Sequence, residues 1–264
     1  MKSLDLYRVY HRILRTLSRT PAAKLDFHET YPRLVKTLKK HHQFDKAMKL
    51  AVGGEFEAFG ILERELLIQQ GLKQDGYLID VGCGSGRLAK PLSQYLTGKY
   101  LGIDVVPELV EYARKLVPQP DWRFEVAEGL RIPEKNNQAD MVCFFSIFTH
   151  LLHEQSYTYL QEAKRVLKSD GKIIFSFLEF SVPGHWPVFE ATIGDMYIGA
   201  HPLNVFLSRD AIETWAAHLD LKVQFIQRGD EPHILLRQPV AFENGAVMEK
   251  QGQLGQSVCV LSLK

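Results

Sequence analysis

The chain has 264 residues, of which 45% are hydrophobic and 24% are charged, and its net charge is +1. This composition is typical of an ordinary globular chain of one large domain, or of one domain with an appendage. No apolar run is long enough to span a bilayer, and the N-terminus lacks the apolar stretch of a secretion signal. The cysteines, Cys83, Cys143 and Cys259, show no C-x-x-C spacing, so we expect reduced packing residues in a cytoplasmic protein.

The charge is unevenly distributed along the chain. The first 50 residues hold 12 Lys or Arg and 4 Asp or Glu, a net charge of +8, whereas the remainder carries −7. Such a basic arm could meet nucleic acid, a phospholipid surface or a phosphorylated substrate. The alternative, which we favour slightly, is that the arm docks on the acidic domain that follows it, because it also carries core-like residues.

The basic arm has the spacing of helices. Apolar residues recur three or four positions apart from Leu6 through Tyr10 and Ile13 to Leu17, and arginines occupy the other face. Further helices are predicted at about 29–40 and 55–70, with a hinge-like glycine pair at 53–54 between them. Helices in this place could close over a ligand, although ordinary helix packing explains their aromatic residues about as well.

Residues 78–86 form an apolar strand that leads into three alternate glycines, Gly82, Gly84 and Gly86, and a helical pattern follows at 87–92. Such a turn lets a ligand approach bare backbone beside unpaired N–H groups. A dinucleotide fingerprint would place its third glycine at position 87, which is Arg. Asp80 lies two residues before the first glycine.

Acidic residues follow the next two predicted strands. Asp104 ends the strand at 99–104, where a carboxylate beside the glycine turn can accept both ribose hydroxyls. It could instead cap the next helix, since Pro107 suits a first helical turn. The strand at 124–128 ends in Glu128, followed by Gly129. A buried strand at 139–146 leads to His150, and a turn on Gly171 precedes a fifth strand.

The order D-x-G-x-G-x-G, acid, acid, buried strand and glycine turn, over residues 77–178, resembles the class I S-adenosylmethionine-dependent methyltransferases. The resemblance implies a Rossmann-like α/β fold, a doubly wound seven-stranded mixed sheet with an N-terminal helical cap. It implies S-adenosylmethionine as cofactor and S-adenosylhomocysteine as product. It implies Val105 on the adenine face and Glu128, where Asp is more usual, at the adenine amino group. The implied cofactor-binding residues are Asp80, Gly82, Cys83, Gly84, Gly86, Asp104, Val105, Glu128, Gly129, Phe145 and Ser146.

The predicted organisation is a helical cap at 1–60 and a cofactor-binding domain at 61–264. An aromatic-rich insertion at about 179–204 follows the fifth strand, on the side where such sheets bind ligands, and is expected to wall an acceptor pocket. A helix at 208–218 and strands at 221–227 and 257–263 complete the sheet. Residues 228–256 could not be assigned.

Methyl transfer to a hydroxyl needs a base, for which His150 is the first candidate and His185 the second. For each, a structural role is at least as probable from the sequence. The N/D-P-P-Y/F motif of base-amine methyltransferases and the acidic cluster of magnesium-dependent catechol enzymes are missing, so we expect no metal. The favoured acceptor is therefore a small or lipid-like molecule, methylated at O or N.

Three alternatives remain open at this stage. RNA or protein could be the acceptor, bound through the basic arm. A nicotinamide-dependent oxidoreductase could use the same sheet, although Arg87 and the pair of acids at Asp104 and Glu128 argue against it. A relative that binds cofactor without catalysis is not excluded, because fold alone does not settle function. The oligomeric state is not predicted.

Overall fold

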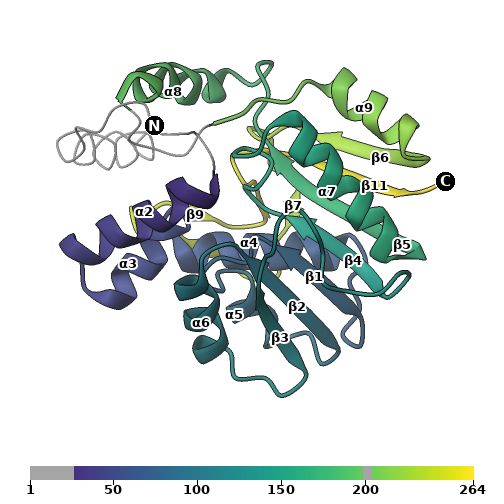
Figure 1. Cartoon of the computed structure of the whole chain (residues 1–264), viewed down its shortest axis with the longest axis horizontal. Helices are drawn as coiled ribbons and strands as arrows, with labels where there is room; N and C mark the ends of the chain where they lie inside the picture. Colours follow the sequence, from purple (N-terminus) through teal and green to yellow (C-terminus); the bar gives the residue numbers. More distant parts are fainter. Residues whose placement is uncertain (1–26, 199–203) are drawn as a thin grey trace.

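The computed structural model describes residues 27–198 and 204–264, so the predicted helix from Leu6 to Leu17 lies outside the described residues. A seven-stranded sheet with the order β3-β2-β1-β4-β5-β11-β6 forms the centre of the molecule (Figure 1). β11 runs antiparallel to β5 and β6, and the other neighbouring pairs are parallel. The strands are β1 (Tyr77–Val81), β2 (Lys99–Asp104), β3 (Trp122–Val126), β4 (Ala139–Phe144), β5 (Leu167–Phe177), β6 (Leu221–Gln227) and β11 (Ser257–Leu263).

Helices cover both faces of this sheet because successive strand residues point to opposite sides. Ile79 and Val142 pack toward one face with α7 (His153–Val166) and α9 (Arg209–His218). Leu78 and Met141 pack toward the other face with α4 (Phe56–Gln69), α5 (Ala89–Leu92) and α6 (Pro107–Leu116). The predicted doubly wound, seven-stranded mixed sheet is confirmed.

Two helices before α4 form a separate apolar cluster. α2 (Phe27–His41) and α3 (Phe44–Ala51) bury Val35, Leu38 and Met48 against Val106 and Leu109 at the start of α6. α2 and α4 match the predicted helices at 29–40 and 55–70, whereas α3 was not predicted. Gly53 and Gly54 form the turn between α3 and α4, both with positive φ. We call α2 and α3 the cap helices.

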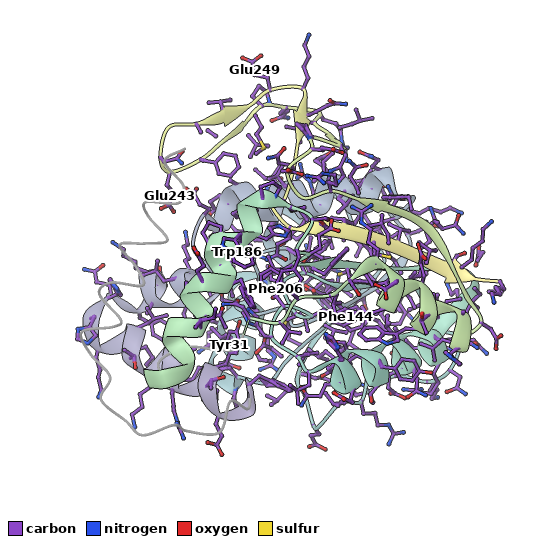
Figure 2. The ribbon with its side chains drawn as sticks, turned by 90° about the horizontal axis from the view of Figure 1, so that it is seen from above. Tyr31, Phe144, Trp186, Phe206, Glu243 and Glu249 are labelled. Carbon is purple, nitrogen blue, oxygen red and sulfur yellow. The ribbon has the colours of Figure 1, made fainter. Side chains whose placement is uncertain are left out.

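The segments after β5 and β6 add two further features. The insertion holds a short 3-10 helix, η1 (Pro183–His185), followed directly by α8 (Trp186–Ile198). Residues 228–256 carry two small antiparallel pairs, β7 (Ile234–Leu235) with β10 (Gln251–Gly252), and β8 (Val240–Ala241) with β9 (Val247–Met248). Figure 2 shows this segment, with Glu243 and Glu249, projecting beyond the sheet and its helices.

Two predicted strand boundaries were wrong. β3 ends at Val126, so Glu128 lies beyond the strand rather than at its last position. β5 begins at Leu167, immediately after α7, rather than after Gly171. The pairing with β4 shifts there, from Ala139 opposite Leu167 to Met141 opposite Lys172, so the residues between form a bulge in place of a reversing turn.

Among the described residues, no helix combines the length and the apolar composition that crossing a bilayer requires.

An ion pair between the buried Glu179 and the partly exposed Arg209 ties the insertion to the end of the sheet. Glu179, after β5, accepts two hydrogen bonds from Arg209 of α9, at 2.8 and 2.9 Å. It also accepts from the hydroxyls of Ser257, at 2.5 Å, and Ser181, at 2.7 Å. Burial alone would raise the pKa of Glu179, but these four donors outweigh it and hold the pKa at about 2.

We expect Glu179→Ala to lower the free energy of unfolding at pH 7 by about 1–2 kcal/mol, because it removes a charged acceptor from Arg209, Ser257 and Ser181, while the partly exposed Arg209 can still be solvated. The folded-state pKa lies below the unfolded one, so this stabilisation is present above about pH 5 and lost as the pH falls toward 2. Urea unfolding at several pH values measures the difference. Glu29→Ala, which breaks an exposed pair with Arg33, is the control, and an equal loss in both variants would contradict the assignment.

Candidate functional site

A cavity of about 450 Å³ lies where the parallel strands end, enclosed by the cap helices, the glycine turn, the loop after β4 and the insertion. Ligands bind at this edge in open α/β sheets, where the strand order reverses between β1 and β4. Most of the predicted site residues line the cavity: Asp80, Gly82, Cys83, Gly84, Asp104, Val105, Phe145, Ser146, His150 and His185.

The glycine turn packs closely against Ile147 and Val52. Gly82 and Gly84 have φ values of 79° and 53°, which side chains rarely adopt. A Cβ on Gly82 would lie 1.9 Å from Ile147, and one on Gly84 would lie 2.4 Å from Val52, at the end of α3. Glycine is therefore needed for both the backbone and the close approach. Gly86 lies outside the cavity, where it packs against Ala113 of α6.

Asp104 joins the glycine turn to the start of α6. Its Oδ2 accepts from the Gly84 N–H and its Oδ1 from the Val106 N–H, both at 2.9 Å. Burial raises the pKa of Asp104 to about 6, although both N–H groups favour the ionised form. Asp104 thus binds the N–H of Val106, the N-cap residue of α6, and does not itself cap the helix; a ligand-facing position stays compatible because one carboxylate offers about four lone pairs.

Asp80 is a buried carboxylate on the cavity floor. The Tyr100 hydroxyl donates to it at 2.6 Å, and the Cys143 thiol lies 3.6 Å away. Burial raises the pKa of Asp80 to about 7, and the negative charge of Glu63 adds to this rise. Cys83 and Cys143 are both buried, and burial raises the pKa of each thiol well above its ordinary range, which suits the predicted packing role.

An ion pair that the sequence analysis missed links α4 to the glycine turn. Arg87 donates to Glu63 at 2.5 Å and to the Val52 carbonyl at 2.6 Å. Its guanidinium also lies 5.8 Å from the centre of the Phe59 ring. Burial raises the pKa of Glu63 even beside this cation. A signal was present, because Glu63 falls four residues after Phe59 on the apolar face of its helix.

The end of β3 is arranged differently from the prediction. Glu128 and Gly129 are exposed and do not line the cavity, whereas Ala127 does. The Ala127 N–H donates to the carbonyl of Asp104, the last residue of β2, at 2.8 Å. Glu128 therefore follows beyond the end of β2. The adenine contact of Glu128 stays a prediction.

Ser146 forms a polar cluster on the opposite side of the glycine turn from Asp104. Its φ of 60° is unusual for a residue with a side chain. Its N–H donates to Ser176 at 2.7 Å, and its hydroxyl lies 3.1 Å from the Gln256 amide nitrogen, which donates to it. Ser176 in turn donates to the Gln256 carbonyl oxygen at 2.7 Å. No sequence signal pointed to Gln256, because its segment could not be assigned.

The two predicted histidines have different surroundings. His150 is partly buried, and its ring meets the Tyr31 ring of α2 edge-on at 5.3 Å. His185 is buried, with Nε2 donating to the Gly255 carbonyl at 2.8 Å and Nδ1 accepting from the Glu179 N–H at 3.0 Å. Both nitrogens of His185 are thus committed to backbone, which favours its structural alternative over a role as base.

Across residues 27–198 and 204–264, His, Cys, Asp and Glu side chains nowhere form a group of three or more that could hold a metal ion.

Comparison with known proteins gives a consistent picture. Residues 79–175 match the family described as "Methyltransferase domain". An uncharacterised protein of Methanocaldococcus jannaschii is 30% identical over 154 residues, 58% of this chain and 52% of that protein. The ubiquinone biosynthesis O-methyltransferase of Cereibacter sphaeroides is 30% identical over 105 residues, 38% of this chain and 40% of the enzyme. The matches span about half or less of these relatives.

Solved structures extend the likeness to the fold. A Methanosarcina mazei structure of the S-adenosylmethionine-dependent methyltransferases has a TM-score of 0.55 at 14% identity, covering 75% of this chain and 98% of its own. The cavity lies at the carboxyl edge of the sheet, the place where open α/β sheets bind ligands. Residues 79–175 are thus similar to the methyltransferase domain, and the fold of the described chain is similar to that of solved methyltransferase structures.

We expect Asp80→Asn to raise the thermal midpoint at pH 8. The folded-state pKa of Asp80 lies above the unfolded one, so ionisation costs stability as the pH rises from about 4 through 7. The variant removes a cost of up to about 4 kcal/mol, a shift of roughly three pKa units, and retains an acceptor for Tyr100. Thermal melts from pH 4 to 8 test this, with the exposed Asp75→Asn as control. A variant less stable than the parent at pH 8 would contradict the assignment.

Proposed function

We propose that this protein transfers a methyl group from S-adenosylmethionine to an O or N atom of a small or lipid-like acceptor. The observation that carries the proposal is the charge of the cavity. Three carboxyl groups line it, those of the buried Glu63 and Asp80 and of the partly buried Asp104, together with the guanidinium of Arg87. Arg87 is held by Glu63 and a backbone carbonyl, so the balance at neutral pH is negative.

A negative cavity suits a cationic nucleoside and disfavours a dinucleotide. Asp104 can accept the two ribose hydroxyls, and Asp80 and Glu63 can attract the sulfonium and ammonium groups of the cofactor. A pyrophosphate would meet these carboxyl groups instead. The helix after the glycine turn, α5, has only four residues and gives such an anion little help. The nicotinamide alternative is therefore disfavoured.

S-adenosylmethionine, when bound, supplies an electrophilic methyl group. The contribution of the chain is to align donor and acceptor and to exclude water, for which the cap helices and the insertion form the outer walls. For a hydroxyl acceptor, His150 can take the proton, because it lines the cavity just after β4. The contact with Tyr31 would fix the plane of its ring.

The walls away from the carboxyl groups support a small or lipid-like acceptor. They are formed by Phe27, Leu34, Leu178, Val188 and Leu254, together with aromatic and apolar neighbours. A recessed and mainly apolar space fits such a molecule better than a base or side chain presented by folded RNA or protein. The relative from Cereibacter sphaeroides is an O-methyltransferase by name, which supports an oxygen acceptor but leaves a nitrogen acceptor open.

Isothermal titration of S-adenosylmethionine, S-adenosylhomocysteine and NADH into the full chain tests the proposal directly. We expect both methionine-derived ligands to bind with micromolar dissociation constants and NADH not to bind. Binding of NADH alone would support an oxidoreductase. Tight cofactor binding with no turnover on a broad panel of phenols, amines and fatty acids would favour a non-catalytic relative.

Asp104→Ala should weaken binding of S-adenosylmethionine roughly tenfold to a hundredfold, because it removes a charged hydrogen-bond acceptor worth about 1.5–3 kcal/mol. In the parent protein the affinity should fall as the pH drops through about 6, where Asp104 takes up a proton. Asp80 titrates near pH 7, so the loss is compared with that of Asp80→Asn. Glu154→Ala, at an exposed position of α7 that does not line the cavity, serves as control, and parental affinity in Asp104→Ala would refute the ribose role.

A further inference from the structure

The polar groups of the cavity lining divide into a charged side and a neutral side. The Asp, Glu and Arg side chains of the lining belong to α4, β1, β2 and the glycine turn. Across β4 in the sheet, the loop after β4, the ends of β5 and β11 and the insertion contribute no Asp, Glu, Lys or Arg from the described residues. This neutral side offers hydroxyl, amide and imidazole groups instead: Ser146, His150, Ser176, His185, Asn204 and Gln256.

Gln256 is fixed on the neutral side through both of its neighbours in sequence. The Gly255 carbonyl accepts a hydrogen bond from His185 Nε2 at 2.8 Å, and the Ser257 hydroxyl donates to Glu179 at 2.5 Å. Ser257 is the first residue of β11 and pairs with the last residue of β5, so Gln256 lies at the carboxyl edge of the sheet. The buried His185 therefore positions the backbone that carries Gln256 rather than acting on a ligand itself.

The Gln256 side chain completes a closed cycle of hydrogen bonds. The Ser146 N–H donates to the Ser176 hydroxyl, which donates to the Gln256 carbonyl oxygen, both at 2.7 Å. The Gln256 amide nitrogen donates to the Ser146 hydroxyl at 3.1 Å. These bonds fix which end of the Gln256 amide is the nitrogen, because Ser176 spends its own hydrogen on the oxygen.

Two hydrogen-bond donors of this cycle remain available to a ligand. An amide nitrogen carries two hydrogens, and the bond to Ser146 uses one of them. Among the described residues, the second hydrogen of Gln256 has no acceptor. The Ser146 hydroxyl is 3.3 Å from the Gln256 carbonyl oxygen, which is long for a bond between oxygens, so its hydrogen can turn to a ligand. Both residues line the cavity.

Donors without a nearby cation suit a neutral oxygen. A carbonyl oxygen has two lone pairs and can accept from both groups. A carboxylate or phosphate would lose its water without gaining a cation, because Arg87, on the charged side, is already bonded to Glu63 and to the Val52 carbonyl. An alkyl group would leave both donors without an acceptor, which costs affinity.

We propose that Gln256 and the Ser146 hydroxyl bind a neutral carbonyl oxygen of the methyl acceptor and thereby orient it. The inference rests on the proposed methyl transfer and narrows its acceptor to mainly apolar molecules that carry a ketone, ester or amide. Ser146 and His150 belong to the same loop after β4, so an acceptor held at Ser146 is held beside the segment that carries the proposed base.

Three phenols of similar size that differ only in the para group test this contact. They are para-hydroxyacetophenone, with a ketone, para-hydroxybenzoate, with a carboxylate, and para-ethylphenol, with an alkyl group. Each is titrated into the full chain saturated with S-adenosylhomocysteine, and ligand-observed NMR gives the dissociation constants. We expect the ketone to bind about tenfold more tightly than either of the other two, because it alone satisfies both donors without burying a charge.

Variants of Gln256 separate this contact from a structural role. Gln256→Leu and Gln256→Glu should each reduce the preference for the ketone over para-ethylphenol to about twofold or less. Gln256→Glu keeps an acceptor for Ser176 but has no N–H, so its loss reports the donor alone. Gln253→Leu, in the same segment but outside the lining, should keep the parental preference. A purely structural role would weaken all three phenols alike.

The other outcomes overturn the inference. Equal binding of the three phenols, tighter binding of the carboxylate or no binding of the ketone by the parent protein would each do so, as would a preference that Gln256→Leu retains. A lower affinity of Gln256→Leu for S-adenosylhomocysteine, with circular dichroism unchanged, would assign Gln256 to the cofactor instead. A parent protein that binds no S-adenosylhomocysteine would refute the proposed function, and this inference with it.

Discussion

The cavity depends on the contact between the glycine turn and the helices that precede the sheet. Val52 occupies the space that a side chain on Gly84 would need, and Arg87 bonds both the Val52 carbonyl and Glu63 of α4. The Ser85 hydroxyl donates to the Met48 carbonyl at 2.9 Å. Since the turn itself is three glycines in a short stretch, these contacts determine its shape as much as its own sequence does.

The same contacts place charge where it is costly. Glu63 and Asp80 are both buried, and Glu63 is paired with the guanidinium of Arg87. Burial raises the pKa of both acids. A core selected only for stability would not keep two such groups, so their persistence beside a ligand cavity is typical of a functional site. A cationic ligand would compensate for this charge, which ties the cost in the free protein to affinity for one class of ligand.

The features that were predicted correctly from the sequence are those that depend on local residue patterns. The glycine spacing, Asp104 and the apolar strands of 77–178 led to the sheet and to most of the cavity residues. Contacts between distant segments were not predictable: Gln256 reaches Ser146 across 110 positions of sequence, and no pattern near it indicates a site. α3 was missed because it is short, and Glu128 was placed at a strand end because the predicted strand was extended two residues beyond Val126, the last residue that pairs with β2 in the ladder.

The packing of Val52 on Gly84 also has a kinetic consequence. Residues 50–53 line the cavity beside the glycine turn, so a ligand lying against that turn lies under the end of α3. Gly53 and Gly54, both with positive φ, follow directly and are the nearest points about which this end can turn. We therefore expect the rate at which a ligand beside the turn is released to respond to changes in the α3–α4 turn.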